Sequence, residues 1–258
     1  MKILKDLPIG AKFADKGRPN IVLRVAGRDL DGYPGTIGVT DNIVRLGCFD
    51  AREPGNPDRY CAMYGNNYYA TCNARRWLTV DGEGWYTPAH KYDAPPIADN
   101  VFNGENPYAD DPGFLTGFSD VFKAAMVKAN IKTRNANTGE IETVNDSVWL
   151  MSATETGYDE NGDEGVFFPI FEEFRMKIAT IDHNAVDTHD SLKSKSWYYW
   201  LRSPTATNSN NVRVVSTDGS VYGISAYVGP YGLRPALLLK SDISVSEPDD
   251  YGVYYVVG

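Results

Sequence analysis

Short apolar runs interrupted by glycine and proline are the feature that most limits the folds open to this chain of 258 residues. The chain contains 24 glycines and 15 prolines, and aromatic residues make up 12% of it. Glycine and proline weaken helices and central strands, whereas aromatic side chains bury a large area in a core. We therefore expect one domain over residues 1–258 with short elements and long irregular loops, and we exclude a helical bundle.

The charge balance limits the partners of the chain. Acidic residues outnumber basic ones by 34 to 25, which gives a formal net charge of -9. Such a surface repels nucleic acid and anionic lipid, so we expect no nucleic-acid partner. The sequence has no run of about 20 apolar residues, and Asp6 and Pro8 fall where a signal peptide has its apolar core. We expect neither membrane insertion nor a signal peptide.

The sequence lacks the common motifs of catalysis and metal binding. Cys48, Cys61 and Cys72 have the spacing of no zinc or redox motif, so we expect free, buried thiols formed in a reducing cell. The three histidines match no metalloprotease or zinc-finger pattern. A nucleophile elbow, a phosphate-binding glycine loop and a dinucleotide fingerprint are also missing from the sequence. We therefore expect no cofactor, no metal and no enzymatic activity.

The acidic run 158–165 resembles a calcium-binding loop at first sight. Counted from Asp159 as its first ligand, the loop has Glu164 at the sixth position, where such a loop requires glycine, and Ile170 at the twelfth in place of glutamate. We interpret the run as an acidic turn.

Local patterns predict both helices and strands. Apolar side chains recur at three- and four-residue steps in three candidate helices, 68–78, 114–129 and 167–181. Short apolar runs predict strands at 21–25, 36–40, 146–151, 212–215, 220–222, 233–240 and 253–257. Asp218-Gly219 is a strong hairpin signal between the fourth and fifth of these runs. The pattern predicts an α+β fold with short antiparallel sheets.

Two apolar segments near the C-terminus, 197–204 and 232–239, are expected to form a rigid frame. Trp200 belongs to the core by its size and apolar setting. Arg202 and Arg234 stand among apolar residues, where a guanidinium group must find acceptors. We expect both arginines to brace loops, and the alternative is that one of them binds an acidic group of a ligand.

The run between these segments has the composition of a binding loop. From Ser216 to Gly232, Tyr222, Tyr227 and Tyr231 alternate with glycine, serine, alanine and proline. Tyrosine offers a large contact area at low entropic cost, and small residues let the backbone adapt. The alternative interpretation is an ordinary surface hairpin that happens to carry tyrosines.

The C-terminal motifs resemble a known group of proteins. Residues 200–204, the Asp218-Gly219 turn and residues 232–236 resemble the signature of uncharacterised domains from gut Firmicutes and their phages. That group is similar to the formylglycine-generating-enzyme branch of the C-type lectin fold. Weaker matches occur in the N-terminal part, at 6–10, 65–68, 76–78 and 149–152. The resemblance implies a C-type-lectin-like fold with two or three helices and long irregular loops.

Several proteins of that fold are variable proteins of diversity-generating retroelements, whose asparagine codons are rewritten at adenines. Codons that arise in this way encode no Lys, Glu, Gln, Met or Trp, and none of these occurs in 216–232. The resemblance therefore implies a variable, ligand-binding segment at about 205–232. The residues expected to contact a ligand are Asn208, Asn210, Asn211, Ser216, Tyr222, Ile224, Ser225, Tyr227, Val228 and Tyr231.

The resemblance extends to the scaffold and not to chemistry. The cysteine pair of the formylglycine-generating enzymes and the calcium-binding signatures of animal lectins are absent from the sequence. We expect a phage- or prophage-encoded recognition protein that binds a host-surface or other macromolecular ligand, protein or glycan. It would be displayed on a virion or outside the cell after synthesis in the bacterial cytoplasm, where homo-oligomeric display would add avidity. The alternatives are a carboxylate-dependent enzyme acting on glycan or peptide, and a structural virion component.

Overall fold

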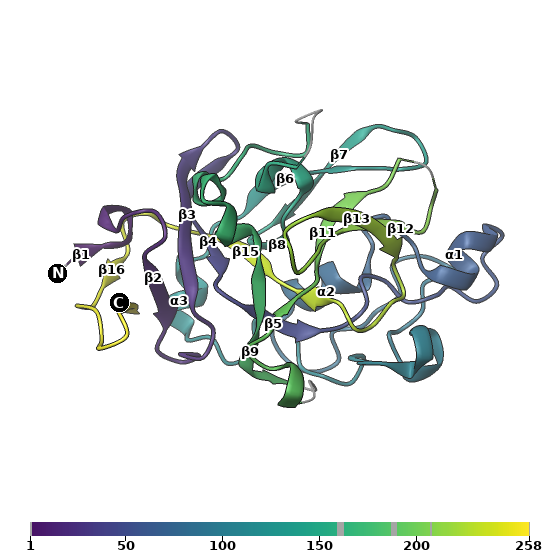
Figure 1. The fold of residues 1–258 in the computed structure, drawn as a ribbon, viewed down its shortest axis with the longest axis horizontal. Coiled ribbons are helices and arrows are strands. Elements are labelled where there is room, and N and C mark those ends of the chain that lie inside the picture. The colour runs from purple at the N-terminus through teal and green to yellow at the C-terminus, as the bar shows by residue number, and fades with distance from the viewer. Residues whose placement is uncertain (1, 159–162, 187–189, 207, 258) are drawn as a thin grey trace.

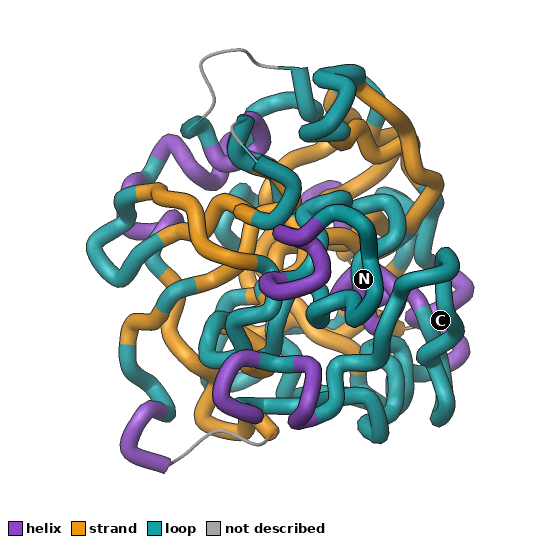
Figure 2. Tube along the Cα trace, turned by 90° about the vertical axis from the view of Figure 1, so that its right-hand side faces the viewer, coloured by secondary structure: helices purple, strands orange, loops and turns teal. Residues whose placement is uncertain are grey.

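Two large β-sheets dominate the computed structural model of the chain (Figure 1). Strands and loops make up most of the trace, and the helices are short (Figure 2). The structure describes residues 2–158, 163–186, 190–206 and 208–257.

The first sheet has eight strands, and it holds both ends of the described chain. In spatial order the strands are β1 (Lys2–Ile3), β16 (Ser244–Val245), β17 (Val253–Val257), β2 (Lys12–Asp15), β3 (Leu23–Leu30), β4 (Tyr33–Thr40), β15 (Pro235–Leu239) and β8 (Val148–Leu150). All neighbours are antiparallel except β17 and β2. The N- and C-terminal segments therefore lie side by side, at one end of the molecule in Figure 1.

The second sheet has seven strands, and it carries the C-terminal hairpin. In spatial order they are β10 (Ser196–Trp197), β9 (Ala179–Val186), β5 (Ile43–Leu46), β14 (Gly232–Leu233), β11 (Tyr199–Pro204), β12 (Asn211–Val215) and β13 (Val221–Ser225). The pairs β5–β9 and β11–β14 are parallel. A separate two-stranded sheet consists of β6 (Ala129–Arg134) and β7 (Ile141–Asp146).

The α-helices in the described ranges are four to seven residues long. The α-helices are α1 (Arg59–Tyr64), α2 (Asn73–Thr79), α3 (Asp120–Ala125) and α4 (Ala153–Thr156). Single 3-10 turns are η1 (Leu4–Asp6), η2 (Ala98–Asn100), η3 (Phe102–Gly104), η4 (Pro169–Glu172), η5 (Phe174–Lys177) and η6 (Asp190–Leu192). The expected α+β, C-type-lectin-like fold class is therefore wrong, because the chain is mostly β and has large sheets rather than short ones.

The predicted helix 114–129 is much shorter in the structure, and its neighbours explain why the prediction was too long. Only Asp120–Ala125 is helical, and the backbone N–H of Val127 already donates to Leu238 O in the first sheet. From Ala129 the chain enters β6, whose side chains alternate between buried and exposed. The helical spacing of Phe118 and Phe122 is followed closely by a segment in which every second side chain is buried. The helical pattern therefore masked the strand pattern in the sequence.

The other two helix predictions were also too long. In 68–78 the helix begins only at Asn73, after Cys72, whose sulfur accepts from the N–H of Arg75. In 167–181, Pro169 starts a 3-10 turn, a second turn ends at Lys177, and β9 begins at Ala179 beside β5. Pairing with a neighbouring strand overrode the local helical pattern in this last segment.

The segment 232–239 joins the two sheets. Gly232–Leu233 forms β14 in the seven-stranded sheet, and Pro235–Leu239 forms β15 in the eight-stranded sheet. Arg234 lies at the crossing, and β15 is buried along its whole length between β4 and β8. The buried hydrophobic residues form one continuous cluster that spans both sheets. The crossing therefore fixes the position at which the preceding segment, 226–231, leaves the core.

Candidate functional site

The hairpin predicted around Asp218-Gly219 is confirmed. Strands β12 and β13 pair in register from Asn211 opposite Ser225 to Val215 opposite Val221. Gly219 has a φ of +82°, a conformation that favours glycine. β13 is the last strand of its sheet, and no described strand pairs with its outer edge. The hairpin therefore presents one free edge.

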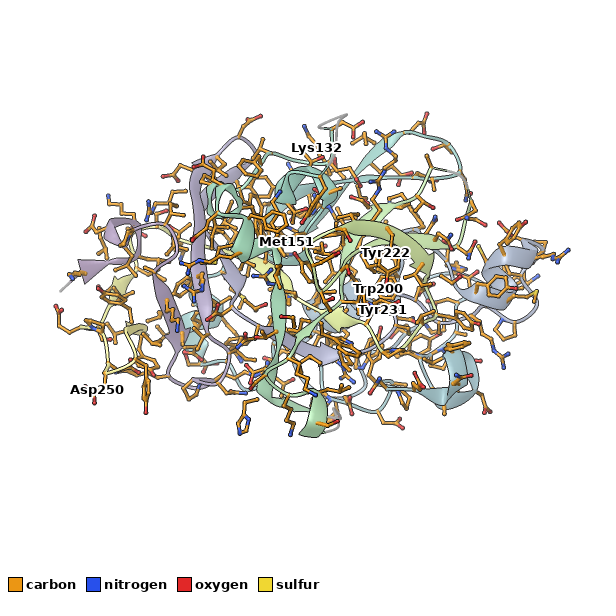
Figure 3. All side chains as sticks on the ribbon, in the orientation of Figure 1. Lys132, Met151, Trp200, Tyr222, Tyr231 and Asp250 are labelled. Atoms are coloured by element: carbon orange, nitrogen blue, oxygen red, sulfur yellow. The ribbon has the colours of Figure 1, made fainter. Side chains whose placement is uncertain are left out.

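A tyrosine cluster, defined here as Tyr198, Tyr222 and Tyr231, lies on this hairpin and beside it. The hydroxyl oxygens of Tyr222 and Tyr231 are 2.9 Å apart. The ring of Tyr198 meets both rings edge-on, with centroids 6.1 Å from Tyr222 and 5.3 Å from Tyr231. Trp200 supports Tyr231 from the core, at 5.2 Å between centroids (Figure 3). Tyr222 keeps 37% of its surface exposed.

Burial and the hydrogen bond with Tyr231 both raise the pKa of the Tyr222 hydroxyl above its ordinary value. The nearby charge of an ionised Tyr231 or Tyr198 would raise that pKa further. Tyr222 is therefore uncharged at neutral pH, and it offers a ring face with a hydroxyl group that can both donate and accept.

A second aromatic group, the Tyr227 cluster, consists of Tyr227, Tyr64 and Phe102. The ring of Tyr227 lies 5.7 Å from Tyr64 and 5.6 Å from Phe102, in edge-on contacts. The backbone fixes the three residues, since the N–H of Tyr227 donates to Tyr64 O and the N–H of Phe102 donates to Tyr227 O, each at 3.0 Å. Phe102 is 39% exposed and Tyr227 is half-buried. Segments far apart in sequence thus complete the surface around Tyr227.

The chain between the two clusters is held tightly. Ile224 and Val228 are half-buried and pack against the core, so each presents only part of its side chain. Ala226 is fully buried, and its carbonyl accepts from the N–H of Phe49 at 2.9 Å. A Cβ at Gly229 would lie 1.9 Å from the carbonyl oxygen of Glu105, so only glycine fits there.

The predicted asparagines and serines lie at the two ends of the hairpin, and Asn210 ties its two strands together at one end. Asn210 is only 4% exposed, and its amide donates to Asn211 Oδ1 and Ser225 Oγ. It was expected at the rim and lies beneath the surface instead. Asn208 accepts from the N–H of Asn211 at 2.8 Å. Ser216 lies in the turn at the opposite end of the hairpin from Ser225.

Asn208 also lines a shallow hollow of about 440 Å³. Asp58 and Tyr60, at the start of α1, line it too, as does Asn137 in the turn between β6 and β7. The segment 205–232 therefore adjoins a polar hollow as well as the aromatic surface, and neither Tyr60 nor Asn137 was expected there.

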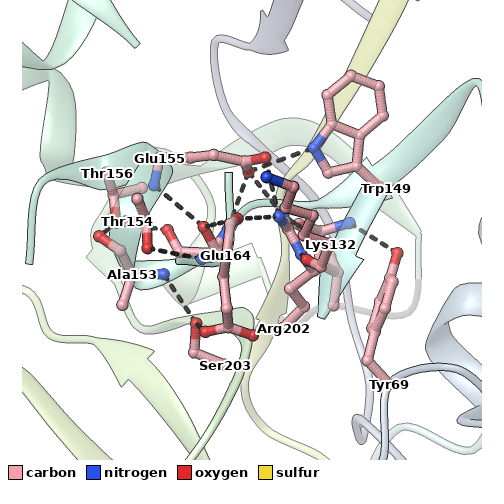
Figure 4. A network of polar contacts seen from close by, with 12 residues as sticks. Tyr69, Lys132, Trp149, Ala153, Thr154, Glu155, Thr156, Glu164, Arg202 and Ser203 are labelled. Atoms are coloured by element: carbon pink, nitrogen blue, oxygen red, sulfur yellow. Dashed lines mark hydrogen bonds and ion pairs between the residues drawn. The ribbon is translucent and has the colours of Figure 1, made fainter. Parts of the chain in front are cut away.

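Arg202 is fully buried in a polar network (Figure 4). Its Nη1 and Nη2 atoms bind the two oxygens of Glu155 at 2.6 and 2.9 Å. Its Nε donates to Lys132 O at 2.8 Å, and Nη1 also donates to Leu150 O. Burial alone would lower the pKa of Arg202, but the charge of Glu155 raises it above its ordinary value. The hydroxyl of Tyr33 donates to the same carboxylate.

The acidic run 158–165 is tied to this network. Glu164 is buried and accepts from Ser203 Oγ at 2.5 Å and from the N–H of Arg134 at 2.9 Å. Its carbonyl oxygen accepts from Arg202. Residues 159–162 lie outside the described residues. The interpretation of 158–165 as an acidic turn did not include the buried role of Glu164.

Arg234 and Trp200 also direct their polar groups inward. Arg234 donates to Thr40 O at 3.1 Å and to Met176 O at 2.9 Å, and its guanidinium group lies 5.1 Å from the ring centre of Tyr199. Trp200 donates from Nε1 to Gly47 O at 2.9 Å. Arg202, Arg234 and Trp200 are all buried, so they hold the frame beneath the aromatic surface and do not reach a ligand.

A group of carboxylates bears on the enzymatic alternative. Burial, together with the charges of Glu53 and Asp93, raises the pKa of Asp50 well above its ordinary value. Asp50 accepts from the N–H groups of Asn73 and Asn66, and Glu53 lies 3.2 Å from His90 Nε2. Asp50 is 3% exposed and Glu53 is fully buried, so the two carboxylates lie beneath the surface.

The described residues contain neither a candidate metal site nor a candidate membrane-spanning helix. No three His, Cys, Asp or Glu side chains among them are grouped so that they could hold a metal ion. Within the same ranges, no helix has the length and apolar character needed to cross a bilayer. All three cysteines are free and buried, as predicted.

Comparison with known proteins gives one match. Residues 38–241 match the family described as "Domain of unknown function (DUF6273)". No curated protein and no solved structure is similar to the chain. The matched range begins within β4 and extends past β15, so it includes the hairpin and both frame segments. Because the match covers most of the sequence, the chain belongs to the DUF6273 family.

Proposed function

We propose that the chain is a recognition protein whose binding surface consists of the tyrosine cluster and the Tyr227 cluster. The ligand is a macromolecule on a host-cell surface, protein or glycan, and the protein is phage- or prophage-encoded. It acts on a virion or outside the cell after synthesis in the bacterial cytoplasm. The observation that carries this proposal is the Tyr222–Tyr231 pair, in which the hydroxyl groups are joined while Tyr222 remains exposed.

The energetics of binding support the proposal. A side chain that is already fixed loses little conformational entropy when a ligand covers it. Tyr222 and Tyr231 fix each other through their hydroxyl groups, and the backbone bonds to Tyr64 and Phe102 fix Tyr227. Preorganised tyrosines of this kind are typical anchors of protein binding surfaces.

The placement of the tyrosines also supports a surface that tolerates diversification. Tyr222 lies on an edge strand with its ring partly in solvent, so a different side chain there leaves the core intact. Arg202 and Arg234, by contrast, are buried and make several hydrogen bonds each. A fixed frame beneath replaceable contacts is what a diversified binding protein requires. Homo-oligomeric display would add avidity.

Sequencing this gene from many related isolates tests the proposal. Substitutions should concentrate at Tyr222, Tyr227 and Tyr231, and they should be absent at Arg202 and Arg234. The matched comparison is Tyr251, which is 82% exposed in the turn before β17 and is expected to vary only by ordinary drift. If the three tyrosines vary no more than Tyr251, the proposed diversified recognition surface is wrong.

A further inference from the structure

A small hollow of about 170 Å³ lies away from the hairpin, between β5, α2 and the loop 111–116. Its charged walls are Arg18, Arg45 and Asp111, and its apolar walls are Val44, Trp77 and Pro112. Trp77 is fixed by its indole N–H, which donates to Pro112 O at 2.9 Å. The hollow therefore has a rigid aromatic wall and two cationic groups.

Arg45 is the unusual residue of this hollow. It is only 3% exposed, and its guanidinium group lies 5.1 Å from the ring centre of Trp77 and 4.8 Å from that of Tyr108. Nε donates to Leu46 O at 3.1 Å, and Nη1 binds Asp111 at 2.5 Å. Nη2 is buried and has no hydrogen-bond partner among the described residues. Buried guanidinium N–H groups normally have an acceptor, because leaving one unpaired costs free energy.

The charges of the hollow favour an anion. Two guanidinium groups and one carboxylate line the hollow, so it is locally cationic although the chain as a whole carries a net charge of -9. Arg18 is half-buried, donates to Phe114 O, and lies over the ring of Phe114. A carboxylate accepts from more than one N–H group, so it can satisfy the unpaired Nη2 of Arg45 and still accept from a second guanidinium group.

The volume and the walls of the hollow limit the size and polarity of the rest of the ligand, apart from its carboxylate. A volume of 170 Å³ holds roughly six water molecules at the density of the liquid. A flat ring or a short branched chain fits that space, and Trp77 and Val44 give it apolar contacts. We propose that this hollow binds a small monocarboxylate with an apolar body of about the size of benzoate, whose carboxylate is held by Arg45 and Arg18.

Benzoate and its neutral analogue benzamide are the probes for this site. The full-length protein is titrated with each, and the indole N–H resonance of Trp77 is followed by NMR. Benzoate should shift the resonance saturably at millimolar concentration, and benzamide should bind at least about tenfold more weakly. The proposal is overturned if benzoate gives no saturable shift or if both compounds bind equally.

Three variants sharpen the test without removing the buried Arg45. Asp111→Asn takes away the carboxylate that competes for Arg45, so benzoate should bind several-fold more tightly. Arg18→Gln should weaken binding several-fold, whereas Arg59→Gln, an equal charge change at an exposed residue of α1, should leave it unchanged. Thermal melting confirms that each variant is folded. Equal effects of Arg18→Gln and Arg59→Gln would contradict the site.

Discussion

The hydroxyl groups of Tyr222 and Tyr231 lie 2.9 Å apart and join the edge strand β13 to the loop that leads into β14. Tyr231 is tied to the frame as well, because its carbonyl accepts from the N–H of Gly47 at 2.9 Å and its ring contacts Trp200. A single residue thus connects the exposed hairpin with the buried core. This link is the reason that the surface is both exposed and ordered.

The Tyr222–Tyr231 pair predicts a loss of stability at high pH. The pKa of Tyr222 is higher in the folded chain than its ordinary value, so the folded state favours the protonated phenol. That contribution is complete below the ordinary pKa of about 10, and it is lost as the pH rises through the folded pKa. Unfolding by urea at a series of pH values should show stability falling above about pH 10.

The variant Tyr222→Phe provides the control for that measurement. It keeps the ring and removes the hydroxyl group, so its stability should fall less steeply with pH than that of the wild type. At neutral pH the variant should lose only about 0.5–1.5 kcal/mol, the usual net value of one hydrogen bond. If the stability of Tyr222→Phe falls with pH as steeply as that of the wild type, the Tyr222–Tyr231 pair does not cause the loss of stability at high pH.

Loss of the buried ion pair should be costly. Arg202→Met leaves the Glu155 carboxylate buried without its guanidinium partner, and we expect a loss of about 3–5 kcal/mol in the free energy of unfolding. Denaturant titration measures the loss. The double variant Arg202→Met with Glu155→Leu removes both charges, so it should be more stable than Arg202→Met alone. A double variant that is less stable would contradict the assignment of the penalty to an unpaired charge.

Gly229→Ala tests the close contact that shapes the loop between the two clusters. Its Cβ would collide with the carbonyl oxygen of Glu105, so the loop must move, at an expected cost of about 1–3 kcal/mol. Gly139→Ala is the comparison, because only its φ of +75° opposes the substitution and its surroundings are open. Differential scanning calorimetry should show the larger loss for Gly229→Ala, and the opposite order would contradict the packing around Glu105.

The thiols should be inert in the folded protein. Burial is the main cause of the raised pKa of all three cysteines, and for Cys61 it raises the pKa to about 12. Because the thiolate is the reactive form, a disulfide reagent at pH 8 should label no thiol in the native state and all three in denaturant. Rapid labelling of Cys61 before unfolding would contradict its burial.

Local signals in the sequence were sufficient for the hairpin and for some of the strands. The Asp218-Gly219 turn, the apolar run at Leu237 and the free thiols are as predicted. The helices were overestimated because their apolar spacing merged with strands that are fixed only by distant partners, as at Ala129 and Ala179. Sheet size depends on such long-range pairing, which no local pattern contains.

The candidate site was predicted only in its C-terminal part. Tyr222, Tyr227 and Tyr231 are placed at or near the surface. The partners of Tyr227, Tyr64 and Phe102, lie at the end of α1 and in the 3-10 turn η3, two short elements that the sequence did not predict. Glu155, the partner of Arg202, lies in a capping box, a pattern that explains the start of α4 and not the ion pair. The structure was needed to identify these contacts between segments that are distant in the sequence.

Binding of the labelled protein to intact cells tests the central claim most directly. A panel of Gram-positive gut bacteria is mixed with the fluorescent wild type and with a variant in which Tyr222, Tyr227 and Tyr231 are replaced by alanine. The matched control replaces Tyr251, Tyr254 and Tyr255, at the opposite end of the molecule from the hairpin.

We expect the wild type and the control to bind saturably to at least one strain, and the Tyr222/Tyr227/Tyr231 variant to lose at least about tenfold in affinity while its melting temperature shows that it is folded. Equal binding by the folded Tyr222/Tyr227/Tyr231 variant and the wild type would contradict recognition through this surface.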